Sequence, residues 1–229
     1  CFPKGEMLLS MAVPGPGEDM RPGYRRIYFI WYRPASVDAL IELFTDQHGK
    51  NHGFSIPPPL IRKELVLEMK AQACAVFAPA VAHIIECVEE PLLQAITDME
   101  SPRMVFERVA IMGDAAFVAR PHTAGGVSKA ALDAECLAES LSSADSDLPE
   151  ALARYERSRL EFGSRLVAHS RYLGASLESE VSATSDPNRL MKARDEERII
   201  RDYGAPGLLH DVDVSKFHSN AGTRVRFEP

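Results

Sequence analysis

The sequence predicts a mixed α/β protein of the α+β kind, in which sheet and helices occupy separate segments. An aromatic and β-branched segment at residues 25–32 is typical of a strand. Apolar residues recur with helical spacing at residues 60–77. Residues 108–141 contain in succession an apolar strand, a glycine-containing loop and a helical repeat, which is the pattern of a strand–loop–helix unit.

Composition limits the classes of function. Of the 229 residues 26 are basic and 33 acidic, and the net charge of −7 argues against a general nucleic-acid binder. The hydrophobic share of 45% is that of an ordinary globular protein, and no run of about 18 apolar residues predicts a membrane span. The four cysteines lack C-x-x-C spacing, which indicates reduced thiols in a cytoplasmic protein: Cys1, Cys74, Cys87 and Cys136.

Residues 1–56 are predicted to be β. The run Met7–Val13 ends at a Pro-Gly-Pro-Gly turn, and the aromatic run Arg25–Tyr32 follows it, so the two are expected to pair as a hairpin. Both faces of the second strand are apolar or aromatic, and both are therefore expected to be covered. An isolated hairpin is marginal in water, so this one needs further sheet.

Residues 57–100 are predicted to be mostly helical. Helical spacing extends from residue 60 to residue 77, where Pro79 interrupts it, and a second short helix is expected over residues 80–87. A strand is expected within residues 91–99.

Two histidines have the spacing of a metal pair. His48 and His52 are four residues apart, but Gly49 and Gly53 break a helix at this point, so a solvated loop without a metal is expected. A second group is predicted to lie on a helix surface: His83, Glu86 and Cys87.

Residues 101–229 are predicted to begin with the strand Arg108–Met112. A helix is expected over residues 127–141, with an apolar stripe: Val127, Ala130, Ala131, Ala134, Leu137, Ala138 and Leu141. A second helix is expected to start at Asp147-Leu148-Pro149, with the stripe Leu148, Leu152, Tyr155, Phe162, Leu166 and Leu173. A third is expected from Asp186-Pro187 to Gly204, followed by a tail without periodicity after Gly207.

The loop after residue 112 is the strongest candidate for chemistry. Gly113 allows a tight exit from the strand, and Asp114 then lies beyond its carboxyl end, where α/β folds place ligands and where a carboxylate can accept hydrogen bonds from hydroxyls. Gly125 and Gly126 allow a flat ligand to approach, and the N-terminus of the next helix favours a carbonyl or an anion. From these residues alone, a turn without a ligand, which Asp114 merely caps, stays open as an alternative.

The same segment resembles the second FAD-binding motif of the flavin-dependent aromatic hydroxylases, the family typified by p-hydroxybenzoate hydroxylase. The family pattern is present at Gly113-Asp114-Ala115-Ala116, Pro121, Thr123-Ala124-Gly125-Gly126, Asp133 and Leu137-Ala138. Members that hydroxylate hydroxypyridines are also similar in the segments GDAAFVARPHTA, VPGPG and IYFIWYRP, so that the resemblance covers roughly residues 1–175.

The resemblance implies FAD as cofactor. The Asp114 carboxylate would bind ribityl hydroxyls, Pro121 would lie close to the isoalloxazine ring, and backbone N–H groups at the helix start would face the N1 and C2-carbonyl region. The cofactor-binding residues implied are Gly113, Asp114, Ala115, Pro121, Ala124, Gly125, Gly126 and Val127. Substrate contacts in this family come from the sheet that faces the flavin, where Ser10 and Tyr28 are the first candidates.

The sequence departs from the family in two places. Many relatives have His where this chain has Phe117, and His122 is instead a weak candidate for a catalytic residue or a loop cap. The only G-x-G is Gly15-Pro16-Gly17, followed by two carboxylates that would repel a pyrophosphate. The N-terminal Rossmann βαβ unit is therefore expected to be missing, and the chain, which has no initiator Met, is expected to be a fragment.

Three domains are expected: residues 1–100 as part of a substrate domain of sheet and helices, 101–175 as the C-terminal part of an FAD-binding domain, and 176–229 as a C-terminal helix and tail. In the family reaction NADH or NADPH reduces FAD, O2 adds at flavin C4a, and the hydroperoxide hydroxylates an activated ring such as a phenol or hydroxypyridine. Family relatives are often dimers, which allows a homodimer here. Two alternatives stay open: a truncated remnant that does not bind FAD, and a helical interaction module built on residues 127–204.

Overall fold

The computed structural model describes residues 1–143 and 147–182. The described residues divide into two compact units, residues 1–96 with 177–182 and residues 97–143 with 147–176, and each is described by itself. The helix predicted from residue 186 to residue 204, and the tail after it, lie outside the described residues. None of the described helices combines the length and the apolar character that a bilayer crossing requires.

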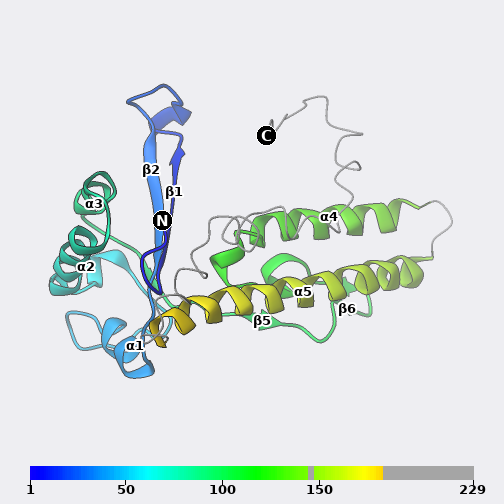
Figure 1. The fold of residues 1–229 in the computed structure, drawn as a ribbon. Coiled ribbons are helices and arrows are strands. Elements are labelled where there is room, and N and C mark those ends of the chain that lie inside the picture. The colour runs from blue at the N-terminus through cyan, green and yellow to red at the C-terminus, as the bar shows by residue number, and fades with distance from the viewer. Residues whose placement is uncertain (144–146, 183–229) are drawn as a thin grey trace. The chain divides into compact units, whose positions relative to one another are not determined.

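The first unit contains the predicted hairpin. Strands β1 (Met7–Val13) and β2 (Arg26–Tyr32) pair antiparallel, which confirms that prediction (Figure 1). Helices α2 (Lys63–Val76) and α3 (Pro79–Glu86) follow in the chain, and they confirm the two helices expected around Pro79.

One face of the hairpin packs on these two helices. The register places Leu8 opposite Trp31, so both side chains lie on the same face of the hairpin. Leu8 is buried together with Ala73 of α2 and Ile85 of α3, and the Trp31 ring meets Phe77 edge-on at 5.0 Å between centroids. Burial of these large apolar side chains stabilises the hairpin against α2 and α3.

The expectation that both hairpin faces are covered is wrong at the distal end. Met11, Ile27 and Tyr28 are each about half exposed. The described residues add no third strand to this sheet, and these side chains stay about half exposed.

The all-β prediction for residues 1–56 is also wrong in part, because Val37–Leu43 form helix α1. The Ser36 hydroxyl accepts a hydrogen bond from the Ala39 N–H at 3.2 Å, which caps the helix. Phe44, Ile56 and Ile61 bury a second small core beside it.

The remaining strands are two residues long and pair antiparallel. β3 (Ser55–Ile56) pairs with β4 (Leu93–Gln94), β5 (Met99–Glu100) with β8 (Phe117–Val118), and β6 (Val105–Phe106) with β7 (Val109–Ala110). The strand expected within residues 91–99 is therefore reduced to β4 and the first residue of β5.

The second unit is built on two long helices. Helix α4 (Gly126–Ser142) lies antiparallel to α5 (Leu148–Ser182), as Figure 1 shows. Arg154 of α5 donates to the Ser140 carbonyl near the end of α4, and Arg159 reaches Asp133 in its middle. Most of the stripe predicted for α5 is buried: Leu152, Tyr155, Leu166 and Leu173.

Candidate functional site

The Gly113 turn lies against the first two turns of α4. The strand predicted over residues 108–112 pairs only at β7, because the described residues offer it no parallel neighbour, and a 3₁₀ turn Gly113–Ala115 follows. Gly113 has a φ of +57°, and a Cβ atom there would lie 3.3 Å from Cβ of Ala130. Both the left-handed backbone and the close approach to α4 therefore favour glycine here.

A buried ionic network fixes this turn. The Asp133 carboxylate, which is fully buried, accepts from the Gly113 N–H at 3.0 Å and pairs with Lys129 Nζ at 2.7 Å. The same Lys129 ammonium donates to the Gly113 carbonyl at 2.7 Å, so both backbone polar groups of this glycine are held. Arg159 Nε reaches the other Asp133 oxygen at 2.7 Å. Charge-assisted bonds of this kind in a dry interior hold a loop firmly.

The predicted buried face of α4 is wrong, because the helix buries the side that carries the ionic network. The buried positions are Lys129, Leu132, Asp133 and Ser140, whereas Val127 is 86% exposed and Leu141 is 49% exposed. Helical spacing identified the repeat but favoured the apolar side, because a buried Lys–Asp pair four residues apart looks from sequence like an exposed one.

The Tyr155 hydroxyl adds a further hydrogen bond that holds the backbone near this turn. It donates to the Ile111 carbonyl at 2.8 Å, just before the turn. Burial, with a smaller contribution from the nearby Asp133 charge, raises the pKa of Tyr155 well above its usual range, so the phenol stays protonated and acts as a donor.

Two sets of polar groups lie beside this turn: a hydrogen-bond acceptor, the Asp114 carboxylate, and hydrogen-bond donors at the start of α4. The Asp114 carboxylate is exposed, and no hydrogen bond within the described part of the chain occupies it. The N–H groups of Gly126, Val127 and Ser128 begin α4, and the first bond back to the preceding loop is donated by the Lys129 N–H to the Gly125 carbonyl at 2.9 Å. The N-terminal N–H groups and the helix dipole favour a carbonyl or an anion.

The loop before α4 is tightly shaped. Ala124 has a φ of +49°, and the Gly125 N–H donates to Thr123 Oγ1 at 3.2 Å. A Cβ atom on Gly125 would lie 3.1 Å from a Leu166 methyl group of α5, whereas one on Gly126 would meet open space. Gly125 therefore lies against the core, and Gly126 lies on the side where a ligand has room.

His122 lies inside this loop and is 6% exposed. Its ring approaches α5 at Gly174, where an added Cβ atom would lie 3.3 Å from Cε1. Burial, together with the Arg120 charge, lowers the pKa of His122 to about 4. The imidazole is thus neutral at pH 7, and its burial favours a packing role over the catalytic role that stays a prediction.

An ionic cluster anchors the other side of the loop. Asp98 accepts from Arg120 Nε at 2.7 Å and from Arg171 at 2.9 and 2.5 Å, and Arg171 also pairs with Glu100. The Arg120 N–H donates to Ser170 Oγ at 3.0 Å. The backbone that leads into Pro121 is therefore fixed against α5.

Phe117 is a core residue. It is 1% exposed, and the Lys129 ammonium lies 5.1 Å from its ring centroid. A Cβ atom on Gly163 of α5 would come within 2.4 Å of this ring, so that glycine makes the space.

The two candidate substrate residues lie on opposite faces of the hairpin. Ser10 pairs with Phe29, whereas Tyr28 pairs with Met11, and adjacent positions along a strand alternate between faces. Ser10 shares the face that α3 approaches, and Tyr28 lies on the other. The structure therefore does not bring the two side chains together.

The loop at residues 46–52 is not simply solvated. His52 Nε2 lies 2.7 Å from Oδ2 of the buried Asp46, whose other oxygen accepts from the His48 and Lys50 N–H groups. The His52 bond is the largest cause that lowers the pKa of Asp46 to about 2. His48 and His83 are exposed, and the described residues contain no group of three or more side chains able to hold a metal ion.

The groups around residues 113–127 fit FAD. An exposed carboxylate suits ribityl hydroxyls, unengaged helix N–H groups suit the flavin N1 and C2-carbonyl region, and the open space beside Gly126 suits a flat ring. The residues implied by the motif therefore lie on one turn, one loop and one helix start of a single unit.

Comparisons with known proteins relate the chain to FAD-binding proteins. A sequence profile described as FAD binding domain-like matches residues 2–98. The chain is 30% identical over 157 residues to 2,6-dihydroxypyridine 3-monooxygenase of Paenarthrobacter nicotinovorans, over 68% of this chain and 38% of that protein.

Solved structures extend the match to the fold. The 2,6-dihydroxypyridine-3-hydroxylase from Arthrobacter nicotinovorans superposes with a TM-score of 0.67 and 25% identity, over 80% of this chain and 45% of that one. Klebsiella pneumoniae HpxO, complexed with FAD and uric acid, superposes with a TM-score of 0.56 and 20% identity. The match covers 90% of this chain and 53% of that one. The chain thus spans about half or less of each relative's length. The chain is related to FAD-dependent aromatic monooxygenases and matches part of their length.

Proposed function

We propose that residues 113–127 form the flavin-side half of an FAD site, in a monooxygenase that hydroxylates an activated aromatic or N-heteroaromatic ring. The proposal rests on two features of one unit: the exposed Asp114 carboxylate, and N–H groups at the start of α4 that make no hydrogen bond to any described residue. The Gly113 turn beside them is held by Lys129 and Asp133. The dihydroxypyridine enzymes among the relatives support the ring class.

Each residue of the half-site has a distinct task. Asp114 would accept hydrogen bonds from ribityl hydroxyls, and the N–H groups of Gly126 and Val127 would face the N1 and C2-carbonyl region, where the helix dipole stabilises negative charge. Pro121 and Ala124 would bound the ring. When bound, FAD supplies the redox chemistry that couples NADH or NADPH and O2 to ring hydroxylation.

The first unit would supply part of the substrate sheet. Tyr28 is about half exposed near the turn of the hairpin, so its side chain is accessible to a ring on that face. Ser10 is also exposed, but it lies on the opposite face, so the two side chains would not contact the same side of one ring. We propose residues 1–100 as part of a substrate domain and residues 101–175 as part of an FAD-binding domain.

The test is flavin retention by the purified chain. The protein is incubated with FAD and desalted, and the visible absorption of retained flavin is compared for the parent, Asp114→Ala and Asp38→Ala chains. Loss of a carboxylate that bonds hydroxyls weakens binding about 10- to 100-fold, whereas the exposed Asp38 of α1 is a matched control. Equal retention by the Asp114 variant would remove the basis of the proposal.

A further inference from the structure

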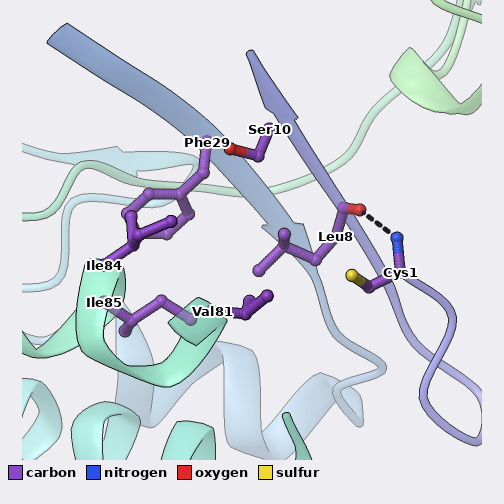
Figure 2. A pocket seen from close by; sticks show the side chains of 7 residues that line it. All are labelled: Cys1, Leu8, Ser10, Phe29, Val81, Ile84 and Ile85. Atoms are coloured by element: carbon purple, nitrogen blue, oxygen red, sulfur yellow. Dashed lines mark hydrogen bonds between the residues drawn. The ribbon is translucent and has the colours of Figure 1, made fainter. Parts of the chain in front are cut away.

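Helix α3 turns two chemically different sides to its surroundings. Figure 2 shows the apolar side facing the hairpin, with Val81, Ile84 and Ile85. With about 3.6 residues per turn, the opposite side carries His83, Glu86 and Cys87. All three are exposed, as is Cys74 near the end of α2. None of these four side chains is among the groups proposed to bind FAD.

The four side chains form one continuous series of polar contacts. Cys74 Sγ donates to Glu86 Oε1 at 3.1 Å, and the other carboxylate oxygen lies 3.4 Å from His83 Nδ1. The second ring nitrogen of His83, Nε2, lies 3.8 Å from Cys87 Sγ. The imidazole therefore lies between a carboxylate and a thiol, which is the order of a nucleophile, its base and the group that orients the base.

The two thiols differ in their partners. The hydrogen bond to Glu86 raises the pKa of Cys74, because the carboxylate holds the thiol proton and its charge disfavours a thiolate. The same bond, followed by the bond from His83, lowers the pKa of Glu86, so this group is a carboxylate at neutral pH. Cys87 has instead an imidazole nitrogen as its neighbour, and that nitrogen is able to take up the thiol proton.

The position of Cys87 makes its reactivity depend on His83. Cys87 is the C-terminal cap of α3, where the helix dipole disfavours a thiolate and favours a cation. His83 lies in the last turn of the same helix, with Glu86 beside it. A proton held on this imidazole offsets the effect of the helix end on the neighbouring sulfur.

We propose that Cys87 is a site of reversible modification by small-molecule disulfides. Cys87 Sγ–H transfers its proton to His83 Nε2, and the thiolate attacks one sulfur of the reagent R–S–S–R. The S–S bond of the reagent breaks, a Cys87–S–S–R bond forms, and the leaving thiolate takes the proton from His83. The Cys87 sulfur is oxidised and the released sulfur is reduced, so no further reactant is needed. The proposal does not depend on the FAD site.

The test is the rate of mixed-disulfide formation between the purified chain and 2-hydroxyethyl disulfide, a neutral reagent that the nearby carboxylates do not repel. Mass spectrometry of fragmented peptides assigns each adduct. At pH 7.5 we expect Cys87 to react at least about fivefold faster than Cys74. His83→Gln should slow Cys87 about tenfold at pH 7.5 but less than about twofold at pH 10, where the thiolate forms without a base. His48→Gln, at another exposed histidine of the same unit, is the matched control.

Glu86→Gln gives an independent readout, because it should change the two thiols in opposite directions. Cys74 should react about three- to tenfold faster, since the carboxylate that disfavours its thiolate is removed. Cys87 should react more slowly, since His83 loses the group that orients it. A change that merely increased local mobility would speed the reaction of both thiols.

Equal rates at Cys74 and Cys87 in the parent chain would overturn the proposal. So would an unchanged rate at Cys87 in His83→Gln, or an equal slowing at both pH values, which would indicate a structural effect. Because His83 and Glu86 are exposed, both variants are expected to fold. None of these results bears on FAD retention, so the two proposals fail separately.

Discussion

Replacing Asp133 by Asn should destabilise the second unit more than any other single isosteric change. The side chain keeps its shape but loses its charge, and Lys129 and Arg159 are left in the interior without an anion. The two cations already outnumber the one carboxylate, and Arg159 Nη2 has no hydrogen-bond partner within the described residues.

The magnitude follows from burial. Lys129 and Asp133 side chains are 1% and 0% exposed and that of Arg159 is 9% exposed, so water cannot compensate the lost pairing. Removal of one partner of a buried ion pair costs about 3–5 kcal/mol. The Gly113 N–H also loses part of its acceptor, which adds to the cost.

Urea unfolding followed by circular dichroism measures the change. Glu135→Gln, an exposed carboxylate on the same helix, is the control and should stay within about 0.5 kcal/mol of the parent. A triple variant, Lys129→Met with Asp133→Leu and Arg159→Met, should recover a large part of the loss, because apolar replacement of a whole buried ionic group is often tolerated. A loss below about 1 kcal/mol in Asp133→Asn would refute the reasoning.

Three further perturbations follow from the same structure. Gly163→Ala should cost about 1–3 kcal/mol in the unfolding free energy, because the new Cβ atom would lie 2.4 Å from the Phe117 ring, and a Phe117→Leu background should relieve most of that cost; an undiminished cost in that background would count against the contact. His122 has a pKa of about 4 in the folded chain against 6.5 in the unfolded chain, so its contribution to the unfolding free energy is present above pH 6.5 and is lost as the pH falls toward 4. Between pH 7.5 and pH 5 the parent should lose about 2 kcal/mol of unfolding free energy that His122→Gln does not lose. Parallel pH profiles of the two proteins would argue against this role of His122. Asp46→Asn should speed hydrogen exchange of the His48 and Lys50 amides at least tenfold, since both donate to Asp46, and unchanged exchange would show that the loop is held by other groups.

The hairpin, helices α2 and α3 and most of the α5 stripe could be predicted from the sequence, because each depends on a short-range period or on turn residues. It did not allow α1 to be predicted, since a seven-residue helix depends on one Ser36 cap inside a segment of mixed propensity. The strand predicted over residues 108–112 is shortened to the two residues of β7 for a different reason. Strand length depends on neighbouring strands, and the described residues supply none parallel to residues 108–112.

The candidate site shows the same division. Glycines, Asp114 and the helix start could be located from residue types at fixed spacing, because turn geometry and helix ends are local. The buried partners of the turn could not, since Lys129 and Arg159 meet Asp133 only when α4 and α5 pack together. Sequence alone also could not show that Ser10 and Tyr28 lie on opposite faces, which depends on the register of the hairpin.

The most direct test of the central claim is a ¹H–¹⁵N titration of this chain with FAD up to millimolar concentration, because it detects even weak binding and locates it. The account predicts saturable shifts at the amides of residues 113–115 and of Gly126 and Val127, weakened at least tenfold by Asp114→Ala and unchanged by Asp38→Ala. Absence of shifts at these amides, or saturable binding elsewhere that ignores Asp114, would contradict it.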